Sequence, residues 1–168
     1  SSILKIGQNI KYDIRVLKKY GVKIESISDT MLMSYAFENG ITRHNLDDLA
    51  QKHLNITTIK FKDVVGTGKK QITFDYVDIK KATKYAAEDA YITYRLFNIL
   101  EKKIAVEKSN FIYNKIDKPL IKVLADMENN GIKVDKKYLQ DLSKKFLKQI
   151  KILEEKIFKI TKKEFNIG

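Results

Sequence analysis

The spacing of apolar residues predicts a mostly helical chain with two short strands near its start. Apolar positions run together or alternate at 3–7 and 22–27, which is typical of strands. Apolar residues return every three or four positions over 10–20, 30–38, 45–53, 77–104, 108–128 and 136–160, and this period predicts helices. Residues 55–75 show no clear period, so we expect them to form an excursion on the surface.

Several predicted helix boundaries carry residue types that favour them. Asp29 and Asp135 are placed to cap the helices that follow them. Helix ends are indicated at Asn39-Gly40 and at Asn129-Asn130-Gly131, because glycine and asparagine readily adopt the left-handed backbone that ends a helix. Pro119 lies inside the helix predicted at 108–128, so we expect a kink there or the start of a new helix.

The last predicted helix has an apolar stripe for which the chain offers no later partner. The stripe consists of Leu139, Leu142, Phe146, Ile150, Leu153, Ile157 and Ile160. Two short strands also cannot build the sheet that so many helices would cover. We therefore expect a fragment of a larger protein, and we expect the exposed helix to allow self-association.

Composition narrows the possible chemistry to carboxylates, hydroxyls and amines. The 168 residues include no Cys and only His44 and His53, which excludes disulfides, thiolate zinc sites and cysteine nucleophiles. No apolar run is long enough to span a bilayer, and the start of the chain lacks the features of a secretion signal. We therefore expect a cytoplasmic protein with no membrane partner.

The formal net charge of +12, from 33 basic and 21 acidic residues, leaves two interpretations open. Clustered Lys and Arg would release counterions from nucleic-acid phosphates, which favours a nucleic-acid partner. A general bias of composition is the other interpretation, because almost all the basic residues are Lys. The excess is larger after residue 101, where 17 basic and 9 acidic residues give +8.

Two carboxylates each lie one helical turn from a polar partner. Asn9 and Asp13 are four residues apart, as are Tyr85 and Asp89, so each pair is predicted to share a helix face. A phenol beside a carboxylate can hold a water against a metal, and the alanines after Tyr85 leave room for a substrate. A solvated helix face is the commoner explanation of such spacing, so both interpretations stay open at this point.

Four segments, in this order, resemble the 3′–5′ proofreading exonuclease domain of bacterial family A DNA polymerases. They are Gly7-Gln8-Asn9-Ile10-Lys11-Tyr12-Asp13, Asp29-Thr30-Met31-Leu32, Arg43-His44-Asn45-Leu46-Asp47-Asp48-Leu49-Ala50 and Tyr85-Ala86-Ala87-Glu88-Asp89-Ala90. The stretch from Pro119 to Asp135 is similar to the junction with the polymerase domain, and Glu164-Phe165-Asn166-Ile167 resembles part of the thumb. The resemblance covers essentially the whole chain.

The resemblance implies an α/β ribonuclease H-like exonuclease fold. We expect it as a mostly helical fragment that lacks the first strands and is followed by long thumb-type helices. Residues 1–106 would be the C-terminal part of the exonuclease domain, and residues 107–168 the junction and the beginning of the polymerase domain. The complete enzyme would be a monomer that replicates and repairs DNA and removes 3′-terminal nucleotides with two divalent metals, Mg²⁺ or Mn²⁺.

The matching motifs also imply roles for individual residues. Asp13 and Asp89 would bind metal, and Tyr85 would orient the attacking water; carboxylates are the hard ligands that magnesium prefers. The implied contacts to a single-stranded 3′ end of primer–template DNA are Gln8, Asn9, Tyr12, Arg43 and Phe61. Phe61 would stack on the terminal base, and the alternative interpretation of Phe61 is an ordinary core aromatic.

One departure from the family pattern limits what we expect of this chain by itself. The family's first motif, Asp-x-Glu on an early strand, is expected to be missing, because only twelve residues precede Asp13. The chain alone should therefore not hold both metals and should neither digest nor extend DNA. Two other functions stay open: a ribonuclease D-like RNA exonuclease, which shares the tyrosine-containing motif, and a non-catalytic basic module that only holds DNA.

Overall fold

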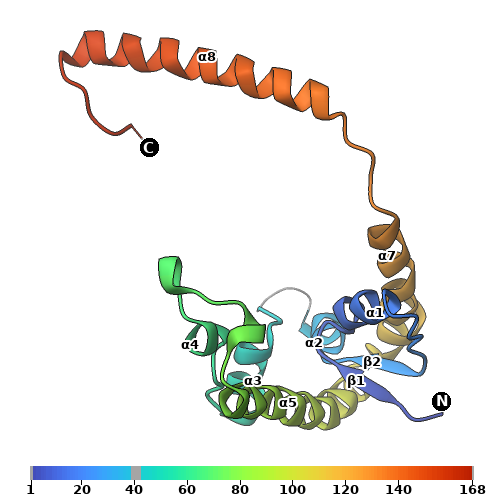
Figure 1. Cartoon of the computed structure of the whole chain (residues 1–168). Coiled ribbons are helices and arrows are strands. Elements are labelled where there is room, and N and C mark those ends of the chain that lie inside the picture. The colour runs from blue at the N-terminus through green and yellow to red at the C-terminus, as the bar shows by residue number, and fades with distance from the viewer. Residues whose placement is uncertain (1, 39–42, 168) are drawn as a thin grey trace. The chain divides into compact units, whose positions relative to one another are not determined.

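The computed structural model describes residues 2–38 and 43–167, and the chain divides into two compact units, Ser1–Asn130 and Gly131–Gly168. The first unit begins with two parallel strands, β1 (Lys5–Gly7) and β2 (Ile27–Asp29), joined by helix α1 (Ile10–Lys18) (Figure 1). Parallel strands need such a crossover because the chain must return to the same end of the sheet. Lys5 pairs with Ile27 and Gly7 with Asp29.

Helices supply most of the remaining first unit. They are α2 (Thr30–Glu38), α3 (Leu46–Leu54), α4 (Phe61–Val65), α5 (Ile79–Val106), α6 (Asn110–Ile112) and α7 (Lys118–Asn130). Short 3-10 turns cover Gly68–Lys70 and Phe74–Tyr76, and a π-helical turn covers Tyr113–Asp117. The helices predicted at 10–20, 30–38, 45–53 and 77–104 are confirmed as α1, α2, α3 and α5. The helix end predicted at Asn39-Gly40 lies outside the described residues.

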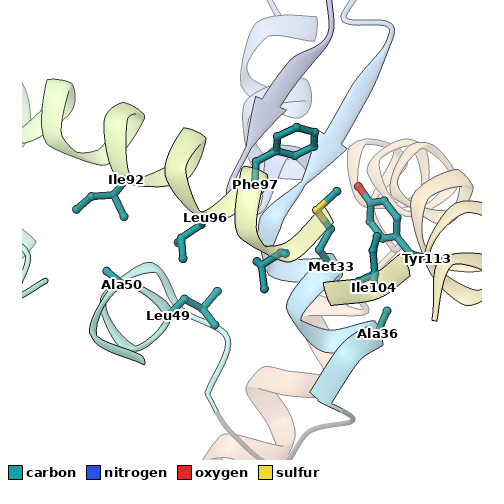
Figure 2. Close-up of a cluster of buried hydrophobic side chains, with 10 residues drawn as sticks. Met33, Ala36, Leu49, Ala50, Ile92, Leu96, Phe97, Ile104 and Tyr113 are labelled. Carbon is teal, nitrogen blue, oxygen red and sulfur yellow. The ribbon is translucent and has the colours of Figure 1, made fainter. Parts of the chain in front are cut away.

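The core of the first unit lies where α5 packs against α2 and α3 (Figure 2). Ile92, Leu96 and Leu100 of α5 are at most 1% exposed, and Met33 of α2 and Leu49 of α3 face them. Burying a side chain of this size stabilises the fold by about 1.5–3 kcal/mol. The core therefore depends mainly on the second half of α5.

The first half of α5 differs from the predicted apolar face. The apolar positions that give residues 77–104 their helical period include Ile79, Ala82, Ala86 and Ala90. Of these, Ala86 and Ala90 are exposed, and Ile79 is 74% exposed. Regularly spaced alanines do not show burial, because alanine occurs on open helix faces as well as in cores. This half of α5 is available for a site instead of a core.

The strand predicted at 22–27 is wrong apart from its last residue. Residues 22–25 have no regular structure, and the strand that pairs with β1 starts only at Ile27. Ser26 has a left-handed backbone, with φ of 56°, which interrupts an extended chain immediately before β2. The alternation of apolar and polar residues in this segment therefore belongs to a loop.

The excursion at 55–75 is more ordered than the sequence predicted. It contains α4, in which Val64 and Val65 are only 4% and 2% exposed. The Ile72 N–H donates to the Val65 carbonyl at 2.9 Å, which closes the loop between them. Gly66 lies in that loop with φ of 82°, a conformation that glycine adopts without strain.

Pro119 lies where the form of the helix changes. It is the second residue of α7, which follows the π-helical turn Tyr113–Asp117 directly, as that turn follows α6. Residues 110–130 are therefore helical throughout, with a π-helical turn immediately before the proline. α7 ends at Asn130, and Gly131 follows it with φ of 68°, as predicted.

The second unit consists of α8 (Lys136–Thr161) and its flanking segments. Asp135 caps this helix as predicted, because its carboxylate accepts the Tyr138 N–H at 2.9 Å. No residue of α8 is buried within the described chain, and Leu139 and Phe146 of the apolar stripe are 50% and 52% exposed. None of the helices described is long and apolar enough to cross a membrane.

Candidate functional site

Asp13, Tyr85 and Asp89 come together at an open hollow of about 480 Å³ beside the C-terminal end of β1. The hollow is lined by Ile6, Gly7, Gln8, Asp13, Leu46, Asp47, Tyr85, Asp89, Ala90 and Thr93. Three of these residues carry carboxylates, and none of them carries a cationic side chain. A concave surface with charge of one sign concentrates ions of the other sign, so this hollow favours cations.

Helix α5 supplies the wall that carries Tyr85 and Asp89. Their side chains are hydrogen-bonded to each other, which confirms that the pair shares a helix face. Thr93, one further turn along, also lines the hollow and is 7% exposed, so this face of α5 leads directly into the core. At the start of α5 the Asp78 carboxylate accepts the N–H groups of Lys80 and Lys81 at 3.1 and 3.2 Å.

The protonation of this pair follows from burial and from nearby charges. Burial raises the pKa of Tyr85 to about 12, and the negative charge of Asp89 acts in the same direction. Tyr85 therefore stays a phenol at neutral pH, and its O–H group donates a hydrogen bond to the Asp89 carboxylate. Burial also raises the pKa of Asp89, the hydrogen bond from Tyr85 opposes this, and the charges of Glu88 and Asp47 add to it.

Asp13 reaches the hollow from α1, and the start of α1 is fixed by Asp29. Asp29 is only 1% exposed. Its carboxylate accepts the N–H groups of Asn9 and Ile10 at 3.2 and 2.8 Å. It also accepts those of Met31 and Leu32 at 2.9 and 3.3 Å. Asp29 thus caps two helices, whereas the sequence predicted a cap for α2 alone.

The close packing at Gly7 also fixes the start of α1. A Cβ atom on Gly7 would lie 2.8 Å from Cβ of Ile10, which is closer than two carbon atoms can approach. Asp13 lies one turn into this helix, and partial burial raises the pKa of its carboxyl group, opposed by its own backbone N–H. Helix α1 therefore brings a carboxylate, that of Asp13, to the same hollow as Asp89, and no cationic side chain lines the hollow to offset either charge.

The prediction that Asn9 and Asp13 share a helix face is wrong. Asn9 has a left-handed backbone, with φ of 59°, and precedes the first residue of α1. It lines a different, smaller cavity together with Asp29 and Asp117. The spacing of four residues could not show this, because it assumed that the helix already included Asn9.

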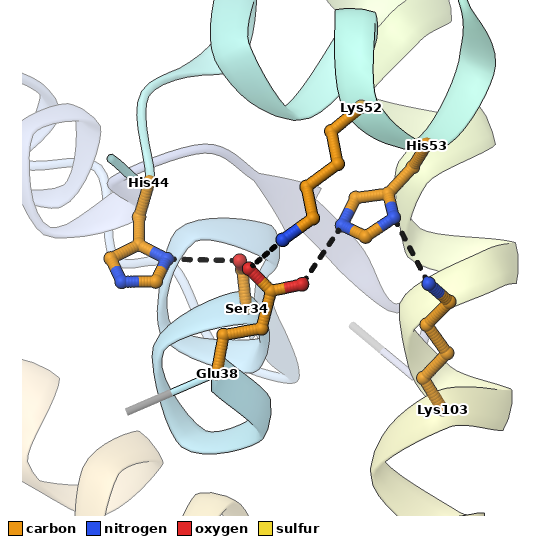
Figure 3. Close-up of polar contacts among 6 residues, drawn as sticks. All are labelled: Ser34, Glu38, His44, Lys52, His53 and Lys103. Atoms are coloured by element: carbon orange, nitrogen blue, oxygen red, sulfur yellow. Dashed lines mark hydrogen bonds and ion pairs between the residues drawn. The ribbon is translucent and has the colours of Figure 1, made fainter. Parts of the chain in front are cut away.

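Gln8 lines the hollow with its side-chain amide held at both ends. Its Nε2 donates to the His44 carbonyl at 2.7 Å, and its Oε1 accepts the Thr30 hydroxyl. His44 is in turn held through Nδ1, which lies 2.9 Å from the Ser34 hydroxyl (Figure 3). Segments that are far apart in the sequence therefore fix the orientation of Gln8.

Aromatic rings border the hollow at Tyr85. The rings of Phe61 and Phe74 each lie 6.0 Å from the ring of Tyr85, centroid to centroid, and 6.1 Å from each other. Phe61 is 49% exposed, so the interpretation of Phe61 as an ordinary core residue is wrong. Its open face remains available to another flat group.

The other predicted contacts lie outside the hollow. Tyr12 is 63% exposed on α1, and Arg43 is exposed directly before His44. Asp47 and Phe74 were not predicted from the sequence as site residues. Asp47 had the pattern of an ordinary acidic residue in the first turn of a helix, and Phe74 lies in a segment without periodicity.

An Asp-x-Glu triplet does occur in the chain, at Asp126-Met127-Glu128, so the expectation that the pattern is missing needs correction. This triplet lies on α7 rather than on a strand. Glu128 accepts from Lys11 and Arg15 of α1, and Asp126 accepts from Lys18 at 2.7 Å. These carboxylates are therefore neutralised by α1 and are absent from the lining of the hollow.

The oxygen atoms in the hollow are of the type that binds a hard divalent cation, but they are too few to complete its coordination. Carboxylate and phenol oxygens are ligands of Mg²⁺ and Mn²⁺, and the pKa values of Asp13 and Asp89 are raised because no lining cation offsets their desolvation. Within residues 2–38 and 43–167, however, no three acidic or histidine side chains are grouped as a metal site would require. Asp13 and Asp89 would thus provide only part of a coordination shell.

Comparisons with known proteins identify the family of this chain. A model of the 3′–5′ exonuclease of A-type DNA polymerases matches residues 1–105. The chain is 44% identical over 167 residues to DNA polymerase I of Rhizobium leguminosarum, with 99% of this chain and 16% of that protein covered. It is 40% identical over 169 residues to DNA polymerase I of Pseudomonas aeruginosa, with 98% and 18% covered.

The fold also resembles a solved structure. The polymerase domain of Pol1 from M. smegmatis, in complex with DNA primer-template and dNTP, matches 98% of this chain and 25% of that chain. The TM-score is 0.69 at 24% sequence identity, so this likeness concerns the fold alone. The present chain spans less than a fifth of the length of the two curated relatives named above.

Proposed function

Because the chain belongs to the 3′–5′ exonuclease family of DNA polymerase I, we propose that its acidic hollow is part of a site that removes nucleotides from a DNA 3′ end. The observation that carries the proposal is the convergence of Asp13, Tyr85 and Asp89 on one hollow without a lining cation. The complete enzyme would also replicate and repair DNA. This chain has the ribonuclease H-like fold of the exonuclease family, and most of its elements are helices.

In this proposal Tyr85 and Asp89 act as one unit. The Tyr85 hydroxyl stays protonated because its pKa is about 12, so it donates to Asp89 and keeps its oxygen lone pairs free to hold a water. Asp89 is then a negatively charged acceptor with a fixed orientation. The Gln8 amide, held by Thr30 and His44, would position the phosphate or sugar that enters beside them.

Asp13 and Asp89 would hold Mg²⁺ or Mn²⁺. When bound, such an ion lowers the pKa of a water and stabilises the negative charge that develops on a phosphodiester. The complete domain would use two ions, and we propose that this chain does not hold both, because the described residues provide no group of three metal-binding side chains. Both carboxylates carry raised pKa values, so a bound ion would lower them.

Contacts to DNA are proposed for Gln8, Asn9, Tyr12, Arg43 and Phe61, with a single-stranded 3′ end of primer–template DNA as the partner. The exposed ring of Phe61 supports this role, because a base can stack on it whatever its sequence. The domain division is part of the same proposal. Residues 1–106 would belong to the exonuclease domain, and residues 107–168 to the junction and the start of the polymerase domain.

We expect the 168-residue chain by itself to leave DNA intact. The test is incubation of the purified chain with Mg²⁺ or Mn²⁺ and a single-stranded oligonucleotide labelled at its 5′ end, followed by gel analysis. No shortening is expected, because the metal site is incomplete. Shortening that disappears in Asp89→Asn would contradict this expectation and would show that the hollow is sufficient for catalysis.

Binding of metal gives a second readout that does not depend on activity. Paramagnetic Mn²⁺ should broaden the amide NMR signals around Asp89 and Asp13 before those of other acidic residues. Asp89→Asn should remove most of that selective broadening, whereas Asp126→Asn, on α7, should leave it unchanged. Broadening that is equal at both places would contradict a metal site in the hollow.

Two alternative functions predict different substrates. A ribonuclease D-like RNA exonuclease would bind a single-stranded RNA end more tightly than the matching DNA end, and a 2′-hydroxyl is the group that would distinguish them. A non-catalytic DNA-binding module would bind DNA with the same affinity when Asp13 and Asp89 are replaced by Asn. The family match over residues 1–105 favours the DNA exonuclease over both.

A further inference from the structure

The excursion between α3 and α5 carries a second exposed aromatic ring beside the hollow. Phe74 lies in the 3-10 turn Phe74–Tyr76 and is 39% exposed. Its ring is nearly parallel to that of Phe61, with 20° between the planes, and it is inclined at 60° to the ring of Tyr85. Three rings in mutual contact therefore join α4, this turn and α5.

The exposure of Phe61 and Phe74 calls for a physical reason. Two large apolar rings, 49% and 39% exposed next to carboxylates, gain less from burial than core residues do. Ring pairs of this geometry still attract each other, by about 0.5–1.5 kcal/mol beyond their burial. The pair is stacked and partly open, which suits a surface on which another flat group stacks.

The excursion is fixed to α5 on both sides of Tyr85. The Lys81 ammonium, one turn before Tyr85, donates to the Asp63 carbonyl at 2.7 Å. The Glu88 carboxylate, three residues after Tyr85, accepts the Ile59 N–H at 2.7 Å. These contacts hold Phe61 close to α5, and Phe74 contacts Phe61 and Tyr85 through its ring.

We propose that Phe74 is a positioning residue, which keeps the ring of Phe61 and the hydroxyl of Tyr85 at a fixed separation. A base stacked on Phe61 would then place its own phosphate at the hollow, within reach of the group that Tyr85 holds. This inference rests on the proposed function. Phe74 acts through the two rings that it touches and need not contact DNA itself.

The test uses the full chain and a single-stranded DNA oligonucleotide with the fluorescent base 2-aminopurine at its 3′ end. Its fluorescence reports stacking, and titration with protein gives a Kd. Phe74→Leu, which keeps an apolar side chain but removes the flat ring, should raise this Kd about fivefold, the lower end of the loss expected for one base–aromatic contact. The same oligonucleotide with 2-aminopurine far from the 3′ end should show no change in its local signal.

Three variants serve as controls. Phe74→Tyr keeps the ring and should restore the wild-type Kd. Phe74→Met is a second variant without a ring and should repeat the loss seen with Leu, provided that helicity by circular dichroism is unchanged. Tyr76→Leu removes a 77% exposed ring from the same turn and should leave the Kd unchanged.

The outcomes separate the inference from the proposed function. If the wild-type chain gives no 3′-end signal, or if Phe61→Leu retains it, the proposed DNA-end site is wrong and the role of Phe74 falls with it. If Phe61→Leu loses the signal while Phe74→Leu and Phe74→Met keep it, the proposed function stands and the inference about Phe74 is overturned. Loss in both ring-less variants, with rescue by Tyr, supports it.

Discussion

Asp29 shows how one buried side chain can determine the geometry of a site that it does not line. Its two carboxylate oxygens accept four backbone N–H groups from the starts of α1 and α2. The Tyr113 hydroxyl in turn accepts the Asp29 N–H at 2.9 Å. Asp13 is carried by α1, so the position of the Asp13 carboxylate depends on the cap that Asp29 provides.

Replacing Asp29 by Ala should therefore destabilise the protein strongly. We expect a loss of about 2–4 kcal/mol in the free energy of unfolding, because two helix caps are lost and buried N–H groups are left without acceptors. Urea unfolding followed by circular dichroism measures this. The matched control is Asp78→Ala, which removes an exposed cap from α5 and should cost about 1 kcal/mol.

If the two variants lost equal stability, Asp29 would be acting as an ordinary cap of one helix.

The capping of two helices by Asp29 could not be predicted from the sequence. The pattern Asp29-Thr30 identifies a helix start at the next residue, but the contact with Asn9 and Ile10 requires β1 and β2 to lie side by side. The same limit explains why Asp47 and Phe74 were missed, since only the folded chain brings them to Tyr85.

At the scale of elements, a buried histidine links α2, α3 and α5. Figure 3 shows His53 of α3 between Glu38 of α2 and Lys103 of α5. Its side chain is 2% exposed, its Nδ1 lies 3.1 Å from the Lys103 ammonium, and its Nε2 lies 3.6 Å from Glu38. Burial lowers the pKa of His53, the charges of Lys103 and Lys52 lower it further, and Glu38 opposes them.

This lowered pKa predicts how stability changes with pH. Below the ordinary value of 6.5 the unfolded chain binds a proton at His53 more readily than the folded chain does. The free energy of unfolding should therefore fall as the pH decreases from about 6.5 towards the folded pKa. His53→Gln should remove this part of the pH dependence, as measured by urea unfolding at a series of pH values from about 5 to 8.

Equal pH dependence in the wild type and in His53→Gln would contradict this account. A useful reference is Lys103→Met, which removes the neighbouring positive charge. It should raise the pKa of His53 towards its ordinary value and weaken the dependence without removing it. The charges involved are therefore those of Glu38, Lys52 and Lys103, on three different helices.

Helices with long, regular apolar spacing were predicted well, whereas short elements were not. The second half of α5 follows from its periodicity, and so does the start of α3 near Asn45, whose side chain accepts the Asp48 N–H as a cap in the structure. The strand predicted at 22–27 was wrong, and the buried helix within the surface excursion predicted at 55–75 was missed, because the deciding features are single residues. Ser26 turns the chain, and Val64 and Val65 are buried by tertiary contacts.

At the scale of the whole molecule, net charge and exposed apolar surface have opposite effects on self-association of the chain. Residues 131–168 carry 11 basic and 5 acidic residues, for a net charge of +6, on a unit whose helix exposes an apolar stripe. The stripe favours self-association, while the like charges oppose it. Salt screens charges at a Debye length of about 10 Å at 0.1 M and about 3 Å at 1 M.

We therefore expect the mass of the chain in sedimentation equilibrium to rise with protein concentration, and to rise more at high salt. Phe146→Lys should abolish the association, because Phe146 is near the middle of the stripe and 52% exposed. Lys148→Gln, on the polar side of α8, should strengthen it slightly. A mass that stays monomeric at every salt concentration would contradict self-association through α8.

The uneven burial of α5 has a consequence for motion. Its second half is locked into the core, whereas the half that carries Tyr85 and Asp89 is covered only on one side. Amide hydrogens should therefore exchange with solvent faster near Tyr85 than near Leu96, along a single continuous helix. The end of α5 that carries Tyr85 and Asp89 should therefore move more freely than its other end, which the core holds in place.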